Sequence, residues 1–115
     1  MAQLNWSEPA RRDMEEIIRY YESLSQKTAL FYSEELLNAG DRLMLMPEMG
    51  PKEPLLERYN RNYRYVLVQR RYKLIYLYEN ETCSILMVWD CRQNPYRLKN
   101  SDRFESLNLE SLNLK

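Results

Sequence analysis

The chain has 115 residues, of which 44% are apolar and 30% are charged, and its formal net charge is zero. These values are typical of one ordinary soluble domain with a modest core. No unbroken apolar run is longer than Ile85 to Trp89, which is far too short to span a bilayer, and the first residues show no signal-peptide pattern. We therefore expect a cytoplasmic protein.

The residue types narrow the possible chemistry. There is no histidine, which excludes Ser–His and Cys–His catalytic pairs. The two cysteines, Cys83 and Cys91, fall on or just after one predicted strand, so about 27 Å of extended chain separates them and no disulfide is expected. We expect small buried thiols, no metal site and no cofactor. Any acid–base chemistry would have to use carboxylates, tyrosine, lysine or arginine.

Two amphipathic helices are predicted in the first half of the chain, after a short strand at Leu4 to Trp6. Ser7 is a suitable cap for the first helix and Ser25 begins the second, which Pro47 stops. The link between them is so short that we expect an antiparallel hairpin. The apolar stripe of the first helix is Ala10, Met14, Ile17, Tyr21 and Leu24, and that of the second is Ala29, Tyr32, Leu36, Ala39, Leu43 and Met46.

Three strands joined by tight turns are predicted in the second half. Residues 47–62 are rich in proline and form a loop with a short turn at Leu55-Leu56. The strands Tyr63–Val68, Tyr72–Glu79 and Thr82–Asp90 follow, because tyrosine, valine, leucine and isoleucine dominate them. One domain is expected over residues 1–98. Residues 99–115, which contain a tandem Glu-Ser-Leu-Asn-Leu repeat, are expected to be a tail.

Charge is unevenly distributed along the chain. Residues 1–57 hold six basic and eleven acidic residues, whereas residues 58–115 hold eleven basic and six acidic ones. Such a division can indicate an acidic or polyanionic partner for the second half. It also arises when helices collect glutamate and strands collect arginine for solubility, so charge alone leaves both interpretations open.

Together these segments resemble the RelE/ParE superfamily of toxins from bacterial type II toxin–antitoxin, or plasmid stabilisation, systems. The similarity covers about residues 3–98 and depends on the order and spacing of its elements. They are Trp6-Ser7 with Ala10 and Asp13, then Ile17, Tyr20 and Tyr21, then Phe31, Leu36, Leu43, Pro47 and Gly50, then Tyr72-Lys73-Leu74-Ile75-Tyr76, and last Arg92-Gln93-Asn94-Pro95.

The resemblance implies an α+β fold with a short N-terminal strand and a helical hairpin packed on one face of a small, twisted antiparallel sheet. It also implies a growth-inhibiting toxin that a cognate antitoxin silences. RelE-like members are endoribonucleases that cleave messenger RNA on the ribosome, which is the activity we expect first. ParE-like members instead bind DNA gyrase and inhibit it without nuclease chemistry, and an inactive, antitoxin-binding member is a further alternative.

Four residues are candidates for RNA cleavage, which needs a base, an acid and positive charge for the phosphorane. By motif match, Lys73 and Arg92 correspond best to basic positions of the family, and Arg64 corresponds loosely. Tyr96, displaced by a couple of residues from the expected tyrosine, could be an acid or a platform for base stacking. We expect these side chains to gather on the sheet face that the helices leave bare. Each residue also has an ordinary structural interpretation, as a solvated or packing side chain of a strand.

Overall fold

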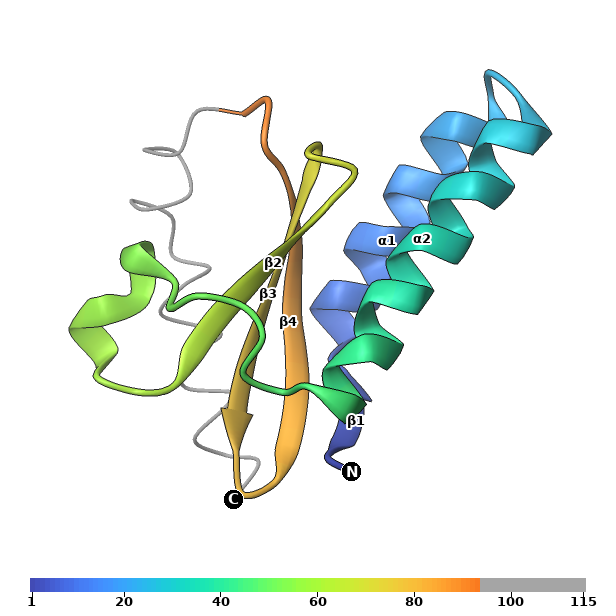
Figure 1. The fold of residues 1–115 in the computed structure, drawn as a ribbon. Coiled ribbons are helices and arrows are strands. Elements are labelled where there is room, and N and C mark those ends of the chain that lie inside the picture. The colour runs from blue at the N-terminus through green and yellow to red at the C-terminus, as the bar shows by residue number, and fades with distance from the viewer. Residues whose placement is uncertain (94–115) are drawn as a thin grey trace.

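The computed structural model describes residues 1–93, and its centre is a four-stranded sheet. The strands are β1 (Gln3–Trp6), β2 (Tyr63–Val68), β3 (Tyr72–Glu79) and β4 (Thr82–Asp90), in the spatial order β1-β4-β3-β2. β2, β3 and β4 form the predicted antiparallel meander. β1 pairs in parallel with residues 82–85, so the sheet is mixed, and the first strand of the chain lies beside the start of its last described strand (Figure 1).

Two helices, α1 (Glu8–Glu22) and α2 (Gln26–Leu45), form the predicted hairpin and cover one face of the sheet (Figure 1). Both begin at a serine cap: the Ser7 hydroxyl accepts the Ala10 N–H at 3.3 Å, and the Ser25 hydroxyl accepts the Thr28 N–H at 3.3 Å. These bonds satisfy amide groups that have no partner inside the helix. The boundaries of the hairpin are therefore set by local sequence, as predicted.

The apolar stripes point to the sheet except at their last members. Of the predicted stripe residues, Leu24 is 65% exposed and Met46 is 54% exposed. Both lie beyond the last residue of their helix, where the helical spacing no longer determines the direction of a side chain. The buried stripe residues are Ala10, Tyr21, Ala29, Leu36, Ala39 and Leu43.

The sheet separates two apolar cores. On the face toward the helices, here called the helix face, Leu74, Tyr76 and Ile85 pack with the hairpin. On the opposite face, here called the outer face, Ile75 and Met87 pack under the 3-10 helix η1 (Pro54–Tyr59). The predicted turn at Leu55-Leu56 lies within η1, which covers part of the outer face (Figure 1).

A β-bulge changes the register between β3 and β4. Ile75 pairs with Met87 while Tyr76 pairs with Ile85, which leaves Leu86 as the extra residue. A bulge places two consecutive side chains on one face of a strand. Both Leu86 and Met87 accordingly belong to the outer-face core.

The two meander turns use residues with positive φ. Asn80 and Glu81 have φ values of 53° and 58°, and Gln69 and Arg70 both have φ values of 54°. Two successive left-handed residues are the pattern of tight hairpin turns that match the twist of the strands. Both turns fall where the sequence predicts them.

Close packing of α2 on β1 depends on Gly40. A Cβ atom at this position would lie 2.9 Å from Cζ2 of Trp6 and 3.2 Å from Cδ1 of Ile85.

Among the described residues, no helix is long and apolar enough to cross a membrane. The predicted tail, with its tandem repeat, lies outside the described residues.

Candidate functional site

Lys73 lies on the outer face and is held by a buried carboxylate. Its Nζ is 2.6 Å from Oε1 of Glu53, whose side chain is completely buried, whereas the side chain of Lys73 is 20% exposed. The same Nζ lies 4.3 Å from the centre of the Tyr65 ring, within cation–π range. The other oxygen of Glu53 accepts the Leu55 N–H at 2.9 Å. Lys73 thus ties the start of η1 to β3.

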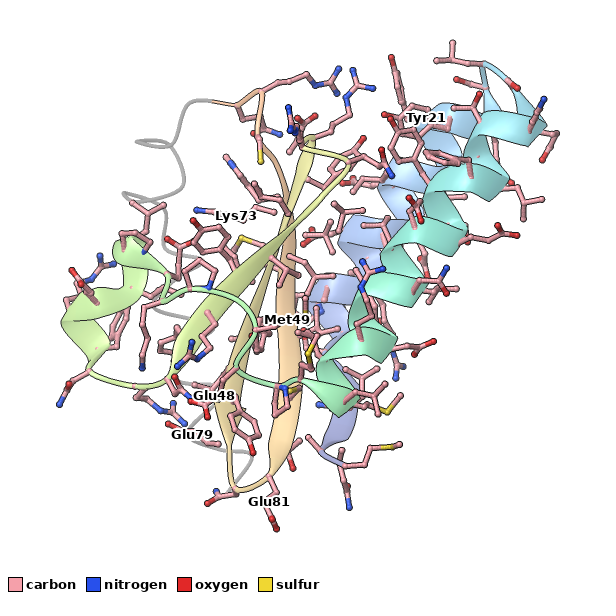
Figure 2. All side chains as sticks on the ribbon, viewed as in Figure 1. Tyr21, Glu48, Met49, Lys73, Glu79 and Glu81 are labelled. Carbon is pink, nitrogen blue, oxygen red and sulfur yellow. The ribbon has the colours of Figure 1, made fainter. Side chains whose placement is uncertain are left out.

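Arg64 is fully engaged at the edge of the sheet. Its guanidinium donates to the Gly50 carbonyl at 2.7 Å and to Asn62 Oδ1 at 2.9 Å, and it forms an ion pair with Glu48 at 3.0 Å. Figure 2 shows Glu48 in the loop that follows α2, beside β2. A planar group with several fixed donors holds such a loop in one geometry. Arg64 therefore fastens this loop to β2.

Arg92 lies just beyond β4, next to an acidic neighbour. Its Nη2 is 2.6 Å from Oδ2 of Asp90, and its Nε donates to both carboxylate oxygens, at 3.0 and 3.1 Å. This hydrogen bonding lowers the pKa of Asp90 and raises the pKa of Arg92. The side chain of Arg92 remains 53% exposed. Its charge is accessible to solvent, but it is largely compensated by Asp90.

The structure does not bring the predicted site residues together. Lys73 belongs to the outer face, where it contacts Tyr65. Arg92 lines a cavity on the α1 side of β4, so the expectation that both lie on the bare face is wrong for Arg92. Figure 2 shows these two sides of the sheet: Lys73 lies on the side of η1, whereas Tyr21 lies on the side of the helices. Tyr96 lies outside the described residues.

Ion pairing in space cancels much of the charge separation along the sequence. Two acids from the first half, Glu48 and Glu53, pair with Arg64 and Lys73 from the second half. Two further cations of the second half pair with acids of the same half, Arg61 with Glu79 and Arg92 with Asp90. Four of the cations of the predicted basic face are therefore compensated by carboxylates.

A network of tyrosines on the helix face joins the hairpin to β3. The hydroxyls of Tyr21 and Tyr72 are 2.9 Å apart, and Arg71 donates to Tyr21 at 3.0 Å and to Tyr32 at 3.4 Å. The rings of Tyr21 and Tyr32 stack at 4.3 Å. Burial and the bond to Tyr21 raise the pKa of Tyr72. Arg71, which lies between β2 and β3, is thus a structural link between α1, α2 and the sheet.

A cavity of about 510 Å³ opens between α1 and the end of β4. One of its acids, Asp13, accepts the Val88 N–H at 2.9 Å and so joins the helix to the strand. In Figure 1 the hairpin and β4 diverge toward this end of the strand. The residues that line the cavity are Asp13, Glu16, Ile17, Tyr20, Val88, Trp89, Asp90, Arg92 and Gln93.

Comparison with known proteins identifies the fold and the family. A solved structure titled as the chromosomal ParDE toxin–antitoxin system from P. aeruginosa matches with a TM-score of 0.63 at 18% identity, over 78% of this chain and 96% of that chain. A comparison with curated proteins gives no match. Residues 4–95 match the family described as the ParE toxin of the type II toxin–antitoxin system parDE. The chain belongs to the ParE toxin family.

Family membership confirms the predicted α+β fold and the predicted toxin of a toxin–antitoxin pair, and it implies an antitoxin as partner. For this ParE toxin, the sequence missed the importance of Glu53, Asp13 and Arg71. Glu53 looks like an ordinary loop carboxylate before a proline, and Asp13, although it belongs to the opening pattern of the family resemblance, otherwise looks like any acid on a helix face. No local pattern shows that their partners lie 20 residues away, in the case of Lys73, or 75 residues away, in the case of Val88.

Proposed function

We propose that this ParE toxin inhibits growth by binding DNA gyrase and has no nuclease chemistry of its own. The observation that supports the proposal is the dispersal of the candidate catalytic cations. Lys73 and Arg92 lie on different sides of the sheet, and each is paired with a carboxylate at 2.6 Å. ParE-like relatives are gyrase inhibitors, which gives the target.

Physical chemistry argues against cleavage of messenger RNA by the described residues. Stabilising a phosphorane requires uncompensated positive charge at the place where negative charge develops. The positive charges of Lys73 and Arg92 are already paired with the carboxylates of Glu53 and Asp90, respectively. Glu53 is also completely buried, so a ribose hydroxyl cannot reach it as a base. A nuclease would have to open each pair before it could use the cation in that pair.

Two assays on the purified toxin test this proposal. Gyrase is assayed by the supercoiling of a relaxed plasmid, and translation is assayed in a reconstituted system in which the cleavage of messenger RNA is mapped by primer extension. We expect supercoiling to be lost while translation continues. Messenger RNA that is cleaved by the wild-type toxin and left at full length by Arg92→Met, a variant that should stay folded, would establish the nuclease activity and overturn the proposal. A third measurement is the growth of cells in which expression of this chain is induced without an antitoxin. Unchanged growth would show that the chain is an inactive member of the family.

A further inference from the structure

The side of α2 that faces away from the sheet carries a second stripe of side chains, here called the solvent stripe. Its three large apolar residues, Leu30, Phe31 and Leu37, are 61%, 46% and 42% exposed. Within the part of the chain that the structure describes, no element lies against this side of the hairpin (Figure 1). Apolar side chains that gather on one side of a helix, rather than singly over a surface, indicate an interaction surface. The solvent stripe consists of Lys27, Leu30, Phe31, Glu34, Leu37, Asn38 and Asp41.

The charged residues of the solvent stripe are available to a partner molecule. Lys27, Glu34 and Asp41 are exposed and follow one another at intervals of seven residues, which is close to two helical turns. Among residues 1–93, none of the three forms an ion pair. Their order along α2 is one cation followed by two acids.

The solvent stripe is symmetric about Glu34. Phe31 and Leu37 lie three residues before and after it, and Lys27 and Asp41 lie seven residues before and after it. In a dimer with a two-fold axis, each residue of one copy meets its counterpart across the axis in the other copy. If two α2 helices pair antiparallel with the axis at Glu34, each Lys27 meets an Asp41 and each Phe31 meets a Leu37. Both contacts occur twice, and both are favourable.

The remaining positions of this arrangement add one unfavourable contact. Leu30 faces Asn38, and the neighbouring cation Arg42 faces Gln26, so neither creates a clash of like charges. Glu34 meets its own copy at the axis, where two carboxylates repel each other. Because Glu34 is exposed, water screens this repulsion, and one screened contact opposes two ion pairs and two apolar contacts.

We propose that α2 joins two copies of this toxin in an antiparallel homodimer whose two-fold axis passes Glu34. A second copy is the occupant because the charges and apolar residues of the solvent stripe are complementary to their own reversed order. One pair of helices forms a small interface, so we expect weak association, with a dissociation constant in the micromolar range. The inference goes beyond the gyrase proposal and does not depend on it.

The decisive experiment exchanges charges between the two copies. Sedimentation equilibrium of the full-length toxin is compared for wild type, Lys27→Glu, Asp41→Lys and an equimolar mixture of the two variants. We expect each variant alone to dimerise on the order of tenfold more weakly than wild type, because the altered contact occurs twice. In the mixture, the new glutamate of one variant faces the new lysine of the other, so association should return to about the wild-type level.

The control for this experiment is Lys52→Glu. Lys52 is also an exposed lysine, but it lies in the loop beside β2, away from α2. It should dimerise like wild type. A wild-type toxin that is monomeric throughout the micromolar range would overturn the proposal. Equal association of Lys27→Glu and Lys52→Glu, or a mixture as weak as its components, would also overturn it.

Two further variants test the axis and the apolar contact. Glu34→Gln removes the repulsion at the axis and should strengthen the dimer, whereas weaker association would contradict the proposed arrangement. Leu37→Gln should weaken the dimer. Leu45→Gln is its matched control, because Leu45 is an exposed leucine of the same helix whose counterpart across the axis would lie before the start of α2. Equal effects of the two leucine substitutions would overturn the proposal. All helix variants introduce good helix formers at exposed positions, so thermal unfolding should show an intact fold.

Discussion

The ion pairs Lys73–Glu53 and Arg92–Asp90 have the same length, 2.6 Å, but lie in opposite surroundings. Glu53 is completely buried under the start of η1, whereas the side chain of Arg92 is 53% exposed beyond the end of β4. Removing one partner from a buried pair leaves an uncompensated charge in the low-dielectric interior of the protein, whereas a charge that is exposed to solvent is hydrated by water. Two pairs that look alike in the sequence therefore have different roles: one stabilises the outer face, and the other adjusts the charge of an open cavity.

The largest effect is expected from Lys73→Met. This change leaves the buried carboxylate of Glu53 without its cation and should lower the free energy of unfolding by about 3 kcal/mol. Urea unfolding followed by circular dichroism measures it. Arg92→Met is the matched control, since its partner Asp90 is half-buried at 20% exposure and can still be hydrated, whereas Glu53 is completely buried, and it should remain closer to wild type. Equal losses in the two variants would contradict the comparison, and Lys73→Met combined with Glu53→Met should recover most of the stability.

The next effect is a loss of stability at alkaline pH that originates on the helix face. Burial raises the pKa of the Cys83 thiol to about 11, whereas an unfolded cysteine titrates near 8.5. The folded state holds this proton over a higher pH range, so its contribution is complete below about pH 8.5 and is lost as the pH rises toward 11. Wild type should lose about 2 kcal/mol more than Cys83→Ala over this window. Parallel stability curves for the two proteins would show that the thiol is not responsible.

Cys91 provides a second contrast with Cys83. Cys91 is exposed, against the expectation that both thiols are buried, although partial desolvation raises its pKa as well. A thiol reagent at pH 8 should therefore modify Cys91 in the folded protein and Cys83 only after unfolding. Mass spectrometry of the labelled peptides distinguishes the two sites.

A smaller effect is expected from the tyrosine network of the helix face. Tyr72→Phe removes the bond between the Tyr21 and Tyr72 hydroxyls and should cost about 1 kcal/mol, the usual net value of one hydrogen bond. Tyr20→Phe, in the exposed neighbour of Tyr21, should change nothing measurable in thermal unfolding. If the two substitutions had the same effect, the network would not be linking the hairpin to β3.

The smallest effect concerns the exposed pair at acid pH. Arg92 lowers the pKa of Asp90, so the pair contributes stability above about pH 4, the ordinary pKa of aspartate, and loses it as the pH falls further. Arg92→Gln should make the stability curve of the protein slightly flatter below pH 4. A larger change than that produced by Lys73→Met would reverse the order of the two pairs.

The candidate site was predictable in its residue types but not in its arrangement. Lys73 falls on a strand, and Arg92 just beyond the end of a strand, that the sequence indicates correctly. The side on which Arg92 lies could not be predicted because the bulge at Leu86 shifts the register of β4, and because the strand ends before Arg92. The same limit applies to Arg71, whose partners Tyr21 and Tyr32 are 50 and 39 residues away.

The sequence by itself determined the element order, the serine caps of both helices and the bounds of the three meander strands. These features depend on contacts over a few residues, which periodicity, capping and turn residues describe directly. Only the tertiary structure decided the parallel pairing of β1, the carboxylate partner of each cation and the cavity beside α1. Those depend on the path of residues 47–62 and on how the hairpin lies on the sheet, because charges interact according to their distance in space and their exposure to water.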